Sequence, residues 1–122
     1  MAYADCFVLP VPKKNLAKYK KMARAAAKIW GEHGAIEYRE CVSEDLKAAK
    51  AMGCVGFDKL SKAKPGDAVV VAWIVYKNRG HRDKVNASVM KDPRLSKMCD
   101  PANMPFNPKA MAYGGFSVMV EG

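Results

Sequence analysis

Two carboxylates lie inside predicted strands, where acidic residues are uncommon. Asp5 belongs to the segment 3–11 and Glu40 to the segment 36–42, and both segments are rich in apolar, strand-forming residues. A buried carboxylate has to be paired or used in function, because an isolated charge is costly to remove from water. Proton transfer to or from a substrate is the functional hypothesis. The structural alternative is a salt bridge to one of three arginines, Arg39, Arg82 or Arg94.

General acid–base chemistry also brings in His81, near the start of a helix predicted over residues 78–90. A histidine titrates near neutral pH and can act as a general base. Its helical neighbours three and four residues on are Lys84 and Val85, so no carboxylate on that side orients the ring. A solvated side chain is the alternative. For His33, after the first predicted helix, the simpler interpretation is a cation at a helix C-terminus.

Three further residues are expected to line a ligand pocket. Trp73 lies on the central strand, where its ring can stack on an aromatic ligand, although such residues on buried strands usually belong to the core. Cys41 follows Glu40 within a strand, and a reactive thiolate there needs a positive partner. Arg94 can bind a carboxylate. The structural alternatives are core packing for Trp73 and Cys41, and a salt bridge for Arg94.

Metal and cofactor sites are not predicted. The four cysteines form no Cys-x-x-Cys pair and the two histidines lie far apart, so no metal-binding spacing exists. The pair Gly114-Gly115 lacks the spacing of a phosphate-binding loop. Glycines within a strand indicate instead a bulge or a close approach by another group. We therefore expect neither a metal nor a cofactor.

Alternating strands and helices must position these residues. Prolines end the first strand, and apolar residues then recur every three or four positions, as in an amphipathic helix that Gly34 ends. The predicted elements are a strand at 3–11, a helix at 15–32 capped by Asn15, strands at 36–42 and 68–76, a helix at 78–90, a helical turn at 93–98 and a strand at 111–120. Residues 43–66 form an elaborated connection, helical at 44–52 with Ser43 as a candidate cap, and residues 99–109 an irregular loop.

The strand at 68–76 is apolar on both faces. One face carries Val71 and Trp73 and the other carries Ala72 and Ile74, whereas a sheet with one solvated face alternates polar and apolar residues. Helices can cover one face, and a second copy of the chain is the simplest cover for the other. The order of elements predicts an α+β fold, a ferredoxin-like βαββαβ antiparallel sheet with two helices on one face.

Five short stretches carry a family resemblance. They are Asp5-Cys6-Phe7-Val8, Ile36-Glu37-Tyr38-Arg39-Glu40-Cys41, Asp92-Pro93-Arg94-Leu95, Met104-Pro105-Phe106 and Tyr113-Gly114-Gly115-Phe116. From residue 3 to residue 120 the chain resembles a family of small bacterial proteins catalogued as domain of unknown function 1428. The resemblance implies the dimeric α/β-barrel superfamily, in which two ferredoxin-like sheets pack face to face. It implies no activity, because that superfamily includes cofactor-free monooxygenases, haem-handling enzymes, isomerases and binding proteins.

This chain departs from the family pattern just before the last strand. Members often carry Asp-Gly-Lys-Arg-Met there, where this chain has Asn107-Pro108-Lys109-Ala110-Met111. Ala110 thus replaces a cationic residue. A role for that loop in binding anions is therefore not expected in this protein.

Composition and charge restrict the class of protein. The chain has 122 residues, with 21 Lys and Arg against 12 Asp and Glu, so its formal net charge is +9. That length fits a single domain over residues 1–122. The longest uncharged apolar run, residues 68–76, falls short of the roughly 18 residues that a membrane-spanning helix needs. Since residues 1–6 also lack the basic start of a secretory signal, we expect a cytoplasmic protein without membrane contact.

Two functions from different classes stay open. The first is a homodimeric α/β-barrel protein that binds or transforms a small molecule in a pocket between the sheet and the helices, with its status as an enzyme undecided. The alternative is a non-catalytic binding module, including weak RNA or DNA association through the basic helices. No helix-turn-helix, RRM or KH signature accompanies those lysines, so a solvated helix face is the simpler interpretation.

Overall fold

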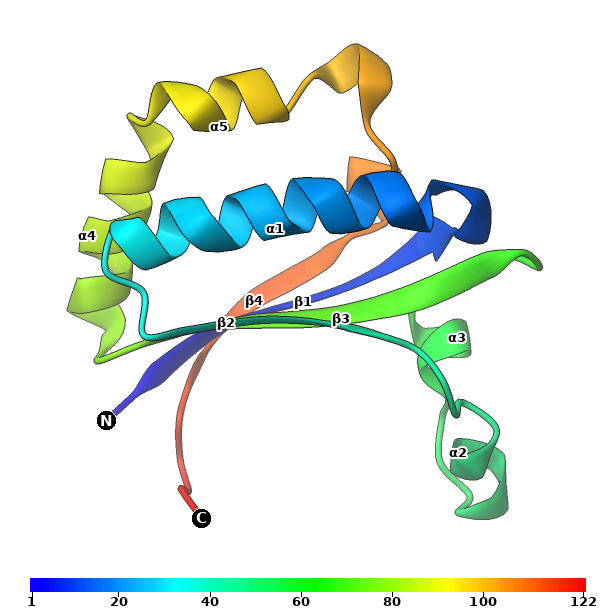
Figure 1. The fold of residues 1–122 in the computed structure, drawn as a ribbon. Helices are drawn as coiled ribbons and strands as arrows, with labels where there is room; N and C mark the ends of the chain where they lie inside the picture. The colour runs from blue at the N-terminus through cyan, green and yellow to red at the C-terminus, as the bar shows by residue number, and fades with distance from the viewer.

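A four-stranded antiparallel sheet forms the centre of the computed structural model, which describes residues 1–122 (Figure 1). The strands are β1 (Tyr3–Pro12), β2 (Glu37–Val42), β3 (Asp67–Tyr76) and β4 (Ala112–Ser117). Their order across the sheet is β2-β3-β1-β4. The central strands β1 and β3 pair along their whole length, with Asp5 opposite Ile74 and Phe7 opposite Ala72. With helices packed on this sheet, the fold is of the α+β class.

Three helices lie together on one side of the sheet. They are α1 (Leu16–Glu32), α4 (Arg79–Met90) and α5 (Pro93–Met98). α1 crosses above the sheet, whereas α4 stands at one end of it and leads into α5 (Figure 1). Two short helices, α2 (Ala48–Ala51) and α3 (Phe57–Leu60), lie beyond the other side, in the connection between β2 and β3 (Figure 1). No helix combines the length and the apolar character that crossing a bilayer requires.

The stripe of apolar residues predicted for the first helix packs α1 onto the sheet. Its buried residues are Tyr19, Ala23, Ala26 and Ile29. Gly34, just after the helix, has a φ of 110°, a conformation that favours glycine and ends the helix as expected. Asn15 precedes α1 as predicted, but its side chain does not cap the helix. Its Nδ2 donates instead to the carbonyl oxygen of Pro105 at 3.0 Å.

The two faces of β3 have different surroundings. The face toward the helices is buried and carries Val70, Ala72, Ile74 and Tyr76. On the opposite face, Val71 and Trp73 are half-buried. Phe116 of β4 belongs to that same face by its register and is 57% exposed. The helices therefore cover one apolar face of the sheet and leave much of the other open.

The last strand is shorter than predicted. It ends at Ser117 rather than at residue 120, because its partner β1 begins at Tyr3, which lies opposite Ser117. The glycines within β4 cause no bulge, since the pairing with β1 is continuous. Their small size instead allows a close approach: a Cβ at Gly115 would collide with the hydroxyl of Tyr3.

The connection between β2 and β3 also differs from its prediction in detail. The helix expected over residues 44–52 is a single turn that begins at Ala48, and Asp45 accepts the Ala48 N–H at 3.2 Å. Ser43 is not the cap, because its Oγ accepts a hydrogen bond from the Val69 N–H at 3.0 Å. A serine that extends the sheet is no longer free to start a helix. The loop over residues 99–109 contains two short 3-10 turns, η2 (Pro101–Asn103) and the start of η3 (Pro108–Ala110).

Candidate functional site

A cavity of about 430 Å³ lies between α1 and the helix-facing side of the sheet. Its lining is mainly apolar and includes five aromatic residues, Phe7, Tyr19, Trp30, Tyr38 and Tyr113. Three polar side chains also line it, those of Asp5, Glu40 and Asn86. An apolar wall with a few polar groups is typical of a small-molecule site.

An open groove of about 600 Å³ adjoins this cavity, between α1 and the edge strand β2. Lys20 and Arg24 of α1 contribute exposed cations to the groove. Tyr19, Tyr38 and Glu40 line both the groove and the cavity. These three side chains therefore form the wall that the two spaces share.

Glu40 is held in that wall by two tyrosine hydroxyls. Tyr19 of α1 donates to Glu40 Oε1 at 2.6 Å, and Tyr38 of β2 donates to Oε2 at 2.8 Å. Tyr38 and Glu40 are two residues apart on β2, so their side chains share a face of the strand. No lysine, arginine or histidine forms an ion pair with Glu40. The predicted arginine partner is thus absent, and the negative charge has only neutral donors.

The two tyrosines remain protonated across the physiological pH range. Burial raises the pKa of both Tyr19 and Tyr38 well above the ordinary phenol value, and the adjacent Glu40 carboxylate raises each pKa further. Both side chains are therefore neutral, and each hydroxyl donates its hydrogen bond to Glu40 without offsetting the negative charge.

Asp5 has the salt bridge that the structural alternative predicts. It is 1% exposed, and its Oδ1 lies 2.9 Å from Nη1 of Arg82 on α4. Tyr113 of β4 donates to the same oxygen at 3.1 Å and accepts from Arg82 at 2.8 Å. The Arg82 guanidinium also lies over the ring of Tyr3, 4.9 Å from its centre. The charge of Asp5 is therefore neutralised within the protein.

Asn86 joins this ion pair to the helix above the cavity. Its Oδ1 accepts hydrogen bonds from Trp30 Nε1 and from the Tyr76 hydroxyl, each at 3.1 Å. Its Nδ2 lies 3.4 Å from Asp5 Oδ2. One amide thus connects α1, β3, α4 and β1 around one end of the cavity.

His81 lies outside both the cavity and the groove. The Nδ1 atom of its ring accepts a hydrogen bond from the backbone N–H of Lys77 at 3.0 Å. The backbone N–H of His81 donates to Asn78 Oδ1 at 2.8 Å, so the Asn78 side chain caps α4. The ring packs edge-on against Tyr76. These contacts hold the start of the helix and give His81 no carboxylate partner.

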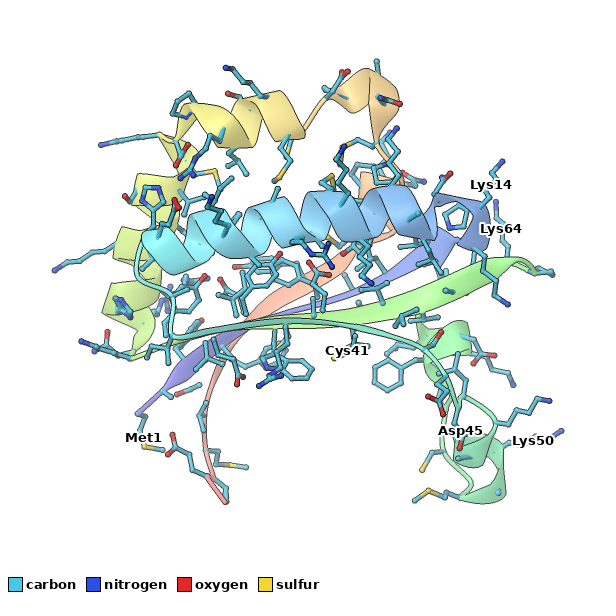
Figure 2. All side chains as sticks on the ribbon, viewed as in Figure 1. Met1, Lys14, Cys41, Asp45, Lys50 and Lys64 are labelled. Carbon is cyan, nitrogen blue, oxygen red and sulfur yellow. The ribbon has the colours of Figure 1, made fainter.

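The three expected pocket residues lie apart from one another. Trp73 lies on the opposite face of the sheet from the cavity, where its Nε1 donates to Glu37 at 2.8 Å. Arg94 binds Asp92 at the start of α5 and lines neither space. Cys41 contributes to the groove, but its exposed side chain lies below the sheet, away from α1 (Figure 2).

A second polar cluster joins the ends of α1 and α4. His33 Nε2 lies 2.9 Å from Asp92 Oδ2, and Nδ1 lies 2.6 Å from Ser88 Oγ. His33 therefore bonds to side chains of neighbouring elements in addition to its place at a helix C-terminus. Neither this cluster nor any other brings together three His, Cys, Asp or Glu side chains that could hold a metal ion.

The sequence interpretation did not identify Tyr19, Trp30 or Asn86 as site residues. Tyr19 and Trp30 belong to the apolar stripe of α1, where periodicity alone indicates a core role. The available signal was their polar atoms, since a buried tyrosine or tryptophan usually needs a hydrogen-bond partner. Asn86 gives a similar signal, because it lies between Val85 and Val89 on the inward side of α4.

Comparisons with known proteins give a family but no activity. A family model described as a protein of unknown function (DUF1428) matches residues 2–108. Similar relatives are the uncharacterised protein YbaA of Escherichia coli strain K12 and the YbaA protein of Shigella flexneri. Each is 36% identical over 121 residues, which cover 99% of this chain and 99% of the relative.

Proposed function

This chain belongs to the DUF1428 family of proteins of unknown function, and we propose that it binds a small organic molecule in the cavity between α1 and the sheet. The observation that carries this proposal is the Glu40 carboxylate, which lines the cavity and has two tyrosine hydroxyls and no cation as partners. A carboxylate can accept about four hydrogen bonds. Glu40 therefore keeps acceptor capacity for a ligand.

The polar side chains around the cavity have separate roles in this proposal. Glu40 accepts a hydrogen bond or a proton from the bound molecule. Tyr19 and Tyr38 fix the orientation of its carboxylate. Asp5, neutralised by Arg82, holds β1, α4 and β4 in position and does not react. The arrangement suits proton transfer to Glu40, since two neutral hydroxyls hold its charged carboxylate and leave it further acceptor positions.

The proposal includes a cytoplasmic homodimer of ferredoxin-like domains. The strand order β2-β3-β1-β4 and the two β-α-β segments support that assignment. The open face of the sheet, which we call the outer face, carries Val71, Trp73 and Phe116. Pairing with a second copy removes these side chains from water, which is the reason to expect it.

Weak RNA or DNA association is the second candidate function. Exposed lysines on α1, such as Lys18, Lys21 and Lys28, favour it because they add to a net charge of +9. Binding through phosphates weakens steeply between about 50 and about 200 mM salt. Failure of an RNA or DNA oligonucleotide to bind at about 50 mM salt would exclude this function.

A fragment screen followed by nitrogen-15 NMR tests the cavity proposal. The mixture should contain neutral, cationic and anionic aromatic compounds small enough for the cavity. We expect amide shifts concentrated at residues that line it, and their loss in Ala26→Leu, which fills the cavity from α1. Ala87→Leu, at an exposed position of α4, is the matched control and should keep the response. No response from any class of compound, or one at residues remote from the cavity, contradicts the proposal.

A further inference from the structure

We infer that the molecule bound in this cavity is an organic cation, an ammonium ion carried on an apolar or aromatic body. The inference rests on the proposed function, because it names the chemical class of the ligand for that same site. Two independent properties of the cavity support it: the charge of its polar wall and the character of its apolar wall.

The charge of the cavity wall is negative. The two carboxylates that line the cavity differ, since Asp5 is paired with Arg82 and Glu40 is paired with neutral hydroxyls. One negative charge therefore has no opposite charge bonded to it. A ligand that brings a positive charge next to Glu40 compensates its negative charge directly, whereas a neutral donor adds one hydrogen bond. An anion in the same place would be repelled.

The apolar wall also suits a cation. Five aromatic residues line the cavity, and rings from opposite walls approach each other, with the centres of Trp30 and Tyr38 6.3 Å apart. Aromatic faces attract ammonium groups, and this attraction grows when the cation is removed from water. Rings beside an uncompensated carboxylate are the combination by which proteins recognise organic ammonium ions.

The basic surface of the protein does not reverse this preference. Lys20 and Arg24 line the groove, but both are exposed and neither forms an ion pair with Glu40, and at 0.1 M salt ions in solution screen exposed charges that lie more than about 10 Å away. Glu40 lies in the wall of the cavity and contacts the ligand directly. The charge nearest the ligand therefore decides which ligand charge is favoured, once salt suppresses the field of the surface lysines.

Calorimetry with three probes of similar shape tests the inference. The probes are 2-phenylethylamine, a cation, 2-phenylethanol, its neutral analogue, and 3-phenylpropanoate, an anion, all at about pH 7 and about 0.15 M salt. We expect the amine to bind at least about tenfold more tightly than the alcohol, and the anion to bind most weakly. Glu40→Gln should reduce the advantage of the amine to within about twofold, while Glu44→Gln, which removes an exposed charge outside the cavity, should keep it.

The outcomes separate this inference from the proposed function. Equal binding of amine and alcohol, or tighter binding of the anion, overturns the inference but leaves the cavity proposal standing. An amine preference that survives Glu40→Gln also overturns it. Failure of all three probes overturns the inference, whereas the cavity proposal is tested separately by the NMR screen. The ranking is measured on the unaltered protein, so poor folding of a variant does not leave the inference untested.

Discussion

The hydroxyl of Tyr19 on α1 donates a 2.6 Å hydrogen bond to Glu40 Oε1 on β2. This bond crosses from the helix to the edge of the sheet and separates the cavity from the groove. Tyr38 holds the other oxygen, so the carboxylate has a defined orientation before any ligand binds. Preorganisation of this kind lowers the cost of binding, because the polar group is already in place.

Replacement of Glu40 should change the ionisation of both tyrosines. Burial is the main cause of their raised pKa values, and the Glu40 carboxylate adds to it. In Glu40→Gln we therefore expect the pKa of Tyr19 and of Tyr38 to fall but to stay above the ordinary value of about 10. Carbon-13 NMR of labelled tyrosine rings over an alkaline titration measures this. Unchanged titration of both rings would show that Glu40 is not their partner.

The raised pKa values of Tyr19 and Tyr38 also predict that the protein loses stability at high pH. A folded-state pKa above the unfolded value means that the unfolded chain loses its protons first. The contribution to stability is therefore complete below about pH 10 and is lost as the pH rises further. Urea unfolding between about pH 8 and pH 11 should show the loss, and it should be smaller in Tyr19→Phe. An equal loss in both proteins would assign the effect to other groups.

Removal of the charge of Asp5 should destabilise the fold strongly. Asp5→Asn leaves the Arg82 guanidinium, whose side chain is 14% exposed, without its buried partner. Breaking a buried pair in this way costs about 3–5 kcal/mol. Asp83→Asn removes the other carboxylate on Arg82, which is 59% exposed, and should cost less than about 1 kcal/mol. Denaturant unfolding compares the two variants, and similar costs would contradict a central role for the Asp5 pair.

Asp92 should make the free energy of unfolding depend on pH in the acidic range. Hydrogen bonds from Arg94 and then from His33 hold the pKa of the Asp92 carboxyl below its usual range. A depressed pKa contributes stability above about pH 4 that is lost as the pH falls below it. The stability difference between the natural protein and Asp92→Asn should therefore shrink as the pH falls from about pH 4 to about pH 2. A difference that stays constant over this range would contradict the prediction.

Periodicity in the sequence was enough to predict most of the elements. The helix stripe around Tyr19 and the apolar run of β3 are local patterns, and both appear in the structure within about two residues of their predicted ends. The end of β4 was not predictable in this way. It depends on where β1 begins, and only the pairing of Ser117 with Tyr3 fixes that point.

The candidate site was predicted only in part, because its contacts join distant segments. Asp5 and Glu40 were identified from their unusual positions, but the sequence offered three arginine partners for them. The sequence could not show that Arg82 forms the ion pair with Asp5, or that two tyrosines form hydrogen bonds with Glu40. Trp73 illustrates a different limit. Alternation along β3 separates its two faces, but both faces are apolar, so the pattern does not indicate which one meets the helices.

The outer face should control association between copies. Val71→Lys places a charge at its centre, and light scattering should then report the 13.4 kDa chain alone, against twice that mass for the natural protein. Val120→Lys is the matched control, because this residue is 77% exposed and lies beyond β4. A monomeric natural protein at micromolar concentration would contradict the proposed dimer.

The two tryptophans allow the most direct test of the central claim, because Trp30 lines the cavity and Trp73 lies on the opposite face of the sheet. The measurement is a fluorescence titration with 2-phenylethylamine of two variants that each keep one tryptophan. Trp73→Phe keeps Trp30, and Trp30→Phe keeps Trp73. If the ligand binds in the cavity beside Glu40, Trp73→Phe will respond with the affinity of the natural protein and Trp30→Phe will stay nearly silent. A response that remains in Trp30→Phe and disappears in Trp73→Phe would place binding on the outer face and contradict the account.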